Sequence, residues 1–167
     1  FFSFYPHNES VYFIIADVAG KGIHAGMVMA KASTLFEVLA QSKVDPDELV
    51  FHMNNDLNNT KTAGMFVTSI VGEYNLITDE IRRVNAGHQP AILRNGQGEY
   101  DQFESSAPPL GVIKQKDKSV YNIHKTKLNG ARFYAFTDGL SESLNDKGEE
   151  IGIEGSIDII EQNYNKD

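Results

Sequence analysis

Cysteine is absent from this chain of 167 residues, which excludes disulfide bonds and thiolate metal sites. Basic residues are few: 15 Lys and Arg stand against 23 Asp and Glu, which gives a formal net charge of −8. A field of this sign repels polyanions, and the loose group Lys114, Lys116 and Lys118 is better explained as a solvated loop. We therefore expect no nucleic-acid partner.

Long apolar runs are lacking as well. No stretch looks long enough to cross a bilayer and nothing resembles a signal peptide, so we expect no membrane insertion of this segment and a cytoplasmic location. No repeat or Pro/Gly/Ser-rich linker divides the chain, which predicts a single domain over residues 1–167. Because the first residue is Phe1 and not Met, we expect this domain to be partial, a fragment of a longer protein.

The order of the expected elements favours an α+β fold. A β-branched and aromatic run predicts a strand at Val11–Ala16, and a spacing of three and four predicts a helix from Ile23. A second helix is expected from Asp45, with Pro46 in its first turn and Glu48 completing a capping box. The further expected elements are strands at Met65–Leu76, Glu80–Asn85, Ala91–Arg94 and Arg132–Phe136 and a helix at Ile157–Tyr164. Hairpins and segregated helices indicate antiparallel sheets in layers. We also expect Asn54, Asn55, Asn58 and Asn59 to fray the second helix into a loop before Thr62.

Two aspartates share one setting. Asp17 and Asp138 each follow a hydrophobic strand and each precede a turn that contains glycine. Carboxylates at strand ends are suited to Mg²⁺ or Mn²⁺, which prefer oxygen ligands and can activate water for attack on phosphorus. Strand-end aspartates are also common as turn formers and helix caps. Spacing alone leaves both interpretations open.

Two turns carry weaker candidates for substrate binding. Lys21 lies in Ala19-Gly20-Lys21-Gly22, which lacks the GxxxxGK[ST] spacing of a phosphate loop, although a helix that begins at Ile23 would favour a nearby anion. His88 lies in a compact turn and is a candidate general acid, metal neighbour or plain turn residue. No GxSxG elbow supports a Ser-His-Asp hydrolase.

Five short motifs, each weak alone, occur in an order found in one family. They are Ala16-Asp17-Val18-Ala19-Gly20-Lys21-Gly22, Phe66-Val67-Thr68, Asn85-Ala86-Gly87-His88-Gln89-Pro90, Pro109-Leu110-Gly111 and Thr137-Asp138-Gly139-Leu140. Together they resemble the SpoIIE/RsbU branch of the PPM (type 2C-like) protein serine/threonine phosphatases. The resemblance covers nearly the whole chain, from Phe1 to Gly152.

This resemblance implies an αββα sandwich, with two antiparallel sheets flanked by helices. It also implies hydrolysis of phosphoserine or phosphothreonine on a regulatory protein, with two Mn²⁺ or Mg²⁺ ions in the intact domain. Asp17 would bridge the metals, Val18 would offer its backbone carbonyl, and Asp138 would bind the second side of the pair. The implied setting is bacterial partner switching, with an anti-anti-sigma (STAS) protein as substrate and an upstream sensor domain in the parent chain.

The chain also departs from the family pattern. The upstream G-G-D-x-x-D-like segment is absent, Asp167 ends the chain before a final strand, and Ala19 stands where eukaryotic relatives carry a histidine. We therefore expect a sandwich truncated at both ends, whose exposed edges favour strand exchange or a homodimer. Two hypotheses stay open: a metal-dependent phosphatase with Asp17 and Asp138 as catalytic residues, and a catalytically inactive module with the same fold.

Overall fold

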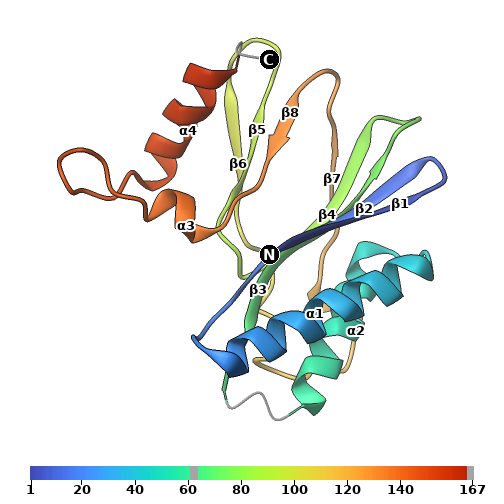
Figure 1. The fold of residues 1–167 in the computed structure, drawn as a ribbon. Helices are drawn as coiled ribbons and strands as arrows, with labels where there is room; N and C mark the ends of the chain where they lie inside the picture. Colours follow the sequence, from blue (N-terminus) through green and yellow to red (C-terminus); the bar gives the residue numbers. More distant parts are fainter. Residues whose placement is uncertain (61–63, 165–167) are drawn as a thin grey trace. The chain divides into compact units, whose positions relative to one another are not determined.

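The computed structural model describes residues 1–60 and 64–164, and these fall into two compact units, residues 1–135 and residues 136–167 (Figure 1). Among the described residues the first unit holds eight strands, two α-helices and a short 3₁₀ helix, and the second holds two helices. The loop expected before Thr62 and the chain end at Asp167 lie outside the described residues.

Five antiparallel strands form the larger sheet, in the order β1-β2-β3-β4-β7. They are β1 (Phe2–His7), β2 (Ser10–Val18), β3 (Val67–Asn75), β4 (Glu80–Ala86) and β7 (His124–Lys127). Alternate residues of a strand point to opposite faces, and in β2 the buried positions are Tyr12, Ile14 and Ala16. The intervening residues of β2, which include Asp17, lie on the other face.

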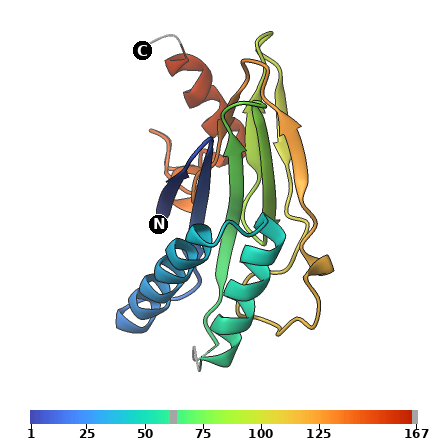
Figure 2. The ribbon, with the colours of Figure 1, turned by 90° about the vertical axis from the view of Figure 1, so that its right-hand side faces the viewer.

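Two long helices cover the face that carries Tyr12, Ile14 and Ala16. They are α1 (Ile23–Gln41) and α2 (Pro46–Asn59), and Figure 2 shows them side by side against the sheet. Val28 and Phe36 of α1 and Met53 of α2 are buried in the same hydrophobic cluster as these strand residues. Burial of this apolar surface is the main force that holds the layers together.

By length and composition alone α1 is apolar enough to cross a membrane, which corrects the expectation that the chain has no such stretch. In the fold its buried side chains, Val28, Ala32, Phe36 and Ala40, belong to the core. A core helix can have the same length and composition as a membrane-spanning helix, so these two properties do not distinguish a core role from a membrane-spanning role.

A smaller antiparallel sheet, in the order β6-β5-β8, completes the first unit. Its strands are β5 (Ala91–Arg94), β6 (Tyr100–Phe103) and β8 (Arg132–Tyr134). The ring of Phe133 in β8 lies 6.1 Å from that of Phe13 in β2, and the guanidinium of Arg83 in β4 lies 3.7 Å from the ring centroid of Phe103. Side chains of the larger sheet therefore pack against the smaller sheet on the side opposite α1 and α2.

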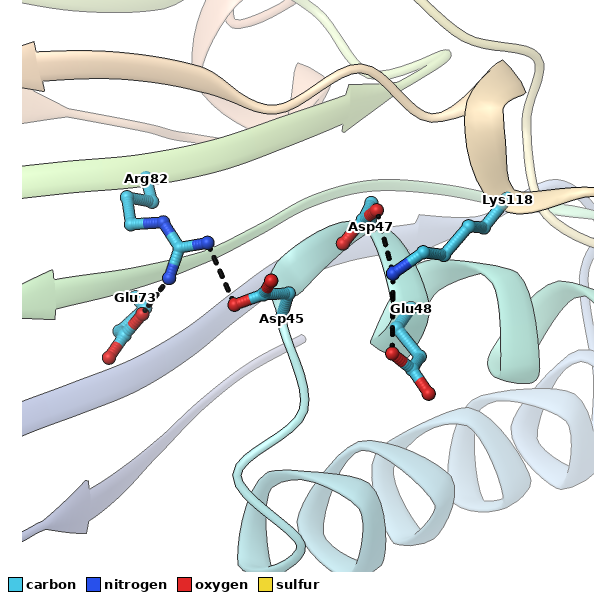
Figure 3. A network of polar contacts seen from close by, with 6 residues as sticks. All are labelled: Asp45, Asp47, Glu48, Glu73, Arg82 and Lys118. Atoms are coloured by element: carbon cyan, nitrogen blue, oxygen red, sulfur yellow. Dashed lines mark hydrogen bonds and ion pairs between the residues drawn. The ribbon is translucent and has the colours of Figure 1, made fainter.

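Ion pairs connect the first turn of α2 to neighbouring elements of the fold (Figure 3). Arg82 on β4 bonds Asp45 at 2.7 Å and Glu73 on β3 at 3.0 Å. Lys118, at the start of the 3₁₀ helix η1 (Lys118–Val120), reaches Asp47 at 3.2 Å and Glu48 at 3.3 Å. Asp45 does occupy the N-cap position, but its side chain makes no cap hydrogen bond, so the expected capping box is replaced by tertiary ion pairs.

The second unit contains α3 (Asp138–Ser141) and α4 (Gly152–Asn163), of which only α4 is a long helix. The sequence placed the start of α4 five residues too late, at Ile157. The segment between the helices turns through Asn145, whose side-chain oxygen accepts the backbone amides of Lys147 and Glu149.

The prediction of an α+β fold with two antiparallel sheets is confirmed. The strand expected at Met65–Leu76 spans Val67–Asn75, and the strand expected at Arg132–Phe136 ends at Tyr134. The predicted fraying of α2 is wrong, because the helix continues through Asn54 and Asn55 to Asn59. The prediction of a single partial domain over residues 1–167 stays a prediction.

Candidate metal and phosphate site

Asp17 is the penultimate residue of β2 and pairs with Thr68 of β3 in the antiparallel register. Residues directly opposite one another in such a pair point to the same face, so the carboxylate of Asp17 and the hydroxyl of Thr68 are neighbours. Asp17 is half-buried, and its carboxylate has no hydrogen-bond or ion-pair partner among the residues that the structure describes. An unpaired carboxylate at the end of a sheet is available to a cation.

The backbone beyond Asp17 forms a tight turn into α1. Val18 pairs with Val67, and the amide of Ala19 donates to the carbonyl of Phe66 at 2.9 Å, which extends the pairing by one residue. Gly20 and Gly22 then adopt φ values of 134° and 79°, in the range that side chains disfavour. The two glycines thus permit the chain to turn into α1 directly after the carboxylate.

Lys21 lies between these two glycines and is exposed. Gly22 occupies the N-cap position of α1 and offers no side-chain cap, so the first amides of a 19-residue helix open close to the end of β2. The resulting positive potential favours a nearby anion. The role of Lys21 in substrate binding stays a prediction.

His88 is buried with 5% of its surface exposed. Its Nδ1 lies 2.8 Å from the hydroxyl of Thr68, and its backbone amide donates to the side-chain oxygen of Asn85 at 2.9 Å. The preceding Gly87 has φ of 70°, and a Cβ there would lie 2.3 Å from the Cγ of Pro109. The turn therefore holds the imidazole against Thr68, which lies directly opposite Asp17 in the neighbouring strand. Substrate binding by His88 stays a prediction.

Asp138 opens α3 in the second unit, directly after Thr137. Its backbone carbonyl accepts the amide of Glu142 at 2.7 Å and the hydroxyl of Ser141 at 3.3 Å, which closes the short helix. The strand-then-turn setting expected from the sequence is thus a strand, a short connection and a helical turn. The roles of Asp138, Asp17 and Val18 as metal ligands stay predictions.

The donors beside the β2 turn suit a hard divalent ion. The Asp17 carboxylate and the Val18 carbonyl are oxygen donors of the kind that Mg²⁺ and Mn²⁺ accept, and the described residues around them include no competing thiolate. Within residues 1–60 and 64–164 no group of three or more His, Cys, Asp or Glu side chains could hold a metal ion.

Sequence reasoning missed the residues that support this site. Thr68 lies inside a motif that indicates no role for it, and Asn85 is recognisable only as part of a turn. Asn54 on α2 was expected to fray the helix, yet it is completely buried and accepts the amide of Gly111 at 3.0 Å. A polar residue on the apolar stripe of a helix is the signal that would have identified Asn54, because a buried amide must find partners.

Known proteins are similar to this chain over nearly its whole length. The family model of Stage II sporulation protein E (SpoIIE) matches residues 7–167. Phosphoserine phosphatase RsbU of Bacillus subtilis is 27% identical over 150 residues, which cover 89% of this chain and 44% of that protein. The chain spans less than half the length of the curated relatives it matches.

Solved structures share the fold. The SiaA-PP2C domain of Pseudomonas aeruginosa aligns with a TM-score of 0.81 at 15% identity, over 98% of this chain and 65% of that one. RsbX in complex with magnesium aligns with a TM-score of 0.69 at 21% identity, over 95% of this chain and 77% of that one. At these identities the likeness shows a PP2C-type fold.

Proposed function

Because the chain belongs to the Stage II sporulation protein E (SpoIIE) family, we propose that it hydrolyses phosphoserine or phosphothreonine on a regulatory protein with the help of divalent metal ions. The observation that carries the proposal is the unpaired carboxylate of Asp17 at the end of β2, beside the carbonyl of Val18 and a glycine turn. This arrangement supplies oxygen donors next to the start of a helix that favours anions.

In this proposal Asp17, Val18 and Asp138 hold Mn²⁺ or Mg²⁺, with two ions in the intact domain. The ions, when bound, supply an activated water and neutralise the charge of the phosphoryl group. Thr68 and His88 keep the neighbouring strand end in place, and Lys21 with the first amides of α1 attracts the phosphate oxygens. No side chain of the described residues is assigned as the acid that protonates the leaving group.

The proposed substrate is a phosphorylated protein of a bacterial partner-switching pathway, and a STAS-type anti-anti-sigma protein fits this class. The name of the relative RsbU, a phosphoserine phosphatase, supports phosphoserine as the group removed. An upstream sensor domain in the parent chain, a homodimer and a cytoplasmic location belong to the same proposal. The net charge of −8 argues against nucleic acid as a partner.

The test is the metal dependence of phosphate release from p-nitrophenyl phosphate and from a phosphoserine protein. We expect Mn²⁺ to support turnover and Asp17→Ala to lower it by about 100-fold or more, because the ions lose a ligand. Asp101→Ala is the matched control, since Asp101 is an exposed aspartate of β6. Turnover that is independent of Mn²⁺, or equal in the Asp17→Ala and Asp101→Ala variants, would contradict the proposal.

A second candidate is a binding module with the phosphatase fold and no activity. It is favoured by one observation, that no group of three or more potential metal-ligating side chains occurs within residues 1–60 and 64–164. It predicts no heat of Mn²⁺ binding in calorimetry of the intact protein. Two saturable Mn²⁺ sites would exclude it.

A further inference from the structure

Two successive asparagines of α2 bind the backbone of a distant loop. Asn54 accepts the amide of Gly111 and donates to the carbonyl of Ile113, both at 3.0 Å. Asn55 accepts the amide of Gln115 at 2.9 Å and donates to the carbonyl of the same residue at 3.0 Å. The two side chains therefore fix the loop 111–115 through its backbone atoms. These four hydrogen bonds involve none of the loop's side chains.

The same loop is tied to the end of β3. Leu110, which directly precedes it, exchanges two backbone hydrogen bonds with Val67, at 2.9 and 2.8 Å. Val67 also pairs with Val18, the neighbour of Asp17. With strands about 4.8 Å apart, the backbone of Leu110 lies roughly 10 Å from that of Val18. Loop 111–115 consequently lies at the same end of the larger sheet as Asp17 and Val18.

Two large apolar side chains project from this fixed loop. Val112 is 49% exposed and Ile113 is 58% exposed. Apolar residues on an immobilised backbone are suited to recognition, because little conformational entropy is lost when a partner covers them. Lys114 and Lys116 follow them and are exposed, which adds positive charge beside the apolar pair.

We propose that Val112 and Ile113 determine specificity for the protein substrate, by contacting an apolar surface patch next to its phosphorylated side chain, and that Asn54 and Asn55 are the positioning residues of this contact. The inference rests on the proposed phosphatase function. A small phosphate ester would approach Asp17 without touching the loop, whereas a folded phosphoprotein covers the surroundings of its phosphoserine. The adjacent lysines favour a partner with an anionic surface.

The contact can be tested on the intact protein with two substrates, p-nitrophenyl phosphate and a serine-phosphorylated STAS domain. The double variant Val112→Ser/Ile113→Ser is compared with Leu76→Ser/Ile77→Ser, a control of equal chemistry. Leu76 and Ile77 are 55% and 70% exposed in the turn at the far end of β3 from Val67. The rise of about 3.3 Å per residue separates the two ends of β3 by roughly 26 Å.

For the loop variant we expect KM for the phosphorylated STAS domain, and its dissociation constant in calorimetry, to rise about tenfold or more. Its kcat for the phosphorylated STAS domain, and its kcat and KM for p-nitrophenyl phosphate, should stay within twofold of the values of the unaltered protein. The control variant should behave as the unaltered protein with both substrates. Asn55→Ala should raise KM for the STAS domain but not for p-nitrophenyl phosphate, because it releases the loop backbone and leaves the proposed metal ligands unaltered.

Several outcomes would overturn the proposal. One is a loop variant whose affinity for the STAS domain stays within twofold, and another is an equal loss in the control variant. An unaltered protein that does not bind the phosphorylated STAS domain would also overturn it. Mn²⁺-dependent turnover of p-nitrophenyl phosphate that requires Asp17 would, in each of these cases, leave the proposed function intact, so the two failures are distinguishable.

Discussion

The substitution Asn54→Leu tests whether the side chain of Asn54 holds the loop 111–115. Leucine has a similar shape, but it leaves the amide of Gly111 and the carbonyl of Ile113 without their partner. A buried backbone group that loses its hydrogen bond costs about 1–3 kcal/mol. Since Ile113 is exposed, its carbonyl can turn to water, and the half-buried amide of Gly111 carries most of the cost. We expect the free energy of unfolding to fall by about 2 kcal/mol.

Urea denaturation followed by circular dichroism measures this difference in the free energy of unfolding. In thermal denaturation, a chain of this length should show a Tm that is lower by roughly 4–8 °C. Hydrogen exchange should show faster exchange at the amide of Gly111. Asn59→Leu is the control: Asn59 is exposed, and among the described residues its side-chain oxygen accepts a hydrogen bond from Lys114 alone, at 2.9 Å. The control should change the free energy of unfolding by less than about 0.5 kcal/mol. An Asn54→Leu variant as stable as the control would refute the role of Asn54.

Two further predictions concern the core. Burial raises the pKa of Tyr121 to about 12, and its hydroxyl has no hydrogen-bond partner among the described residues. Tyr121→Phe should therefore raise the free energy of unfolding by about 1 kcal/mol. Between pH 10 and pH 12 the Tyr121 side chain loses its proton in the unfolded chain but keeps it in the folded chain. The free energy of unfolding should therefore fall as the pH rises, and it should fall less in Tyr121→Phe. Identical pH profiles of the two proteins in chemical denaturation would contradict this prediction. Gly72→Ala should lower the free energy of unfolding by about 1–3 kcal/mol, because the new Cβ would lie 2.5 Å from the ring of Phe13 and 2.8 Å from the carbonyl of Arg82. An unchanged denaturation midpoint in Gly72→Ala would show that Phe13 moves aside without cost.

The sequence predicted those elements whose periodicity is strong. The apolar stripe of α1 and the β-branched runs of β2 and β3 gave the correct type of element, with boundaries within two residues. The strand β7 was missed because its residues, HKTK, are polar and mostly exposed, so no alternation of burial marks it. Its place at the edge of the larger sheet comes from pairing with β4, a long-range contact that leaves no local signal.

At the candidate site, the sequence indicated which residues could bind a metal but not what supports them. Asp17 is recognisable because it follows an apolar strand and precedes two glycines. The contact between Thr68 and His88 depends on a turn that brings residues 20 positions apart together. Asn54 and Asn55 were misinterpreted because asparagine disfavours helix interiors by local propensity, whereas tertiary hydrogen bonds to residues 57–60 positions later compensate for it. Propensity considers only the local chain, and these partners lie far along it.

Calorimetric titration of Mn²⁺ into the intact protein and into Asp17→Asn, Asp138→Asn and Asp101→Asn shows whether these aspartates bind metal. We expect saturable Mn²⁺ binding in the unaltered protein and in Asp101→Asn, and affinity at least tenfold weaker in Asp17→Asn and in Asp138→Asn. Equal Mn²⁺ affinity in all four proteins, or no saturable binding in the unaltered protein, would contradict this expectation.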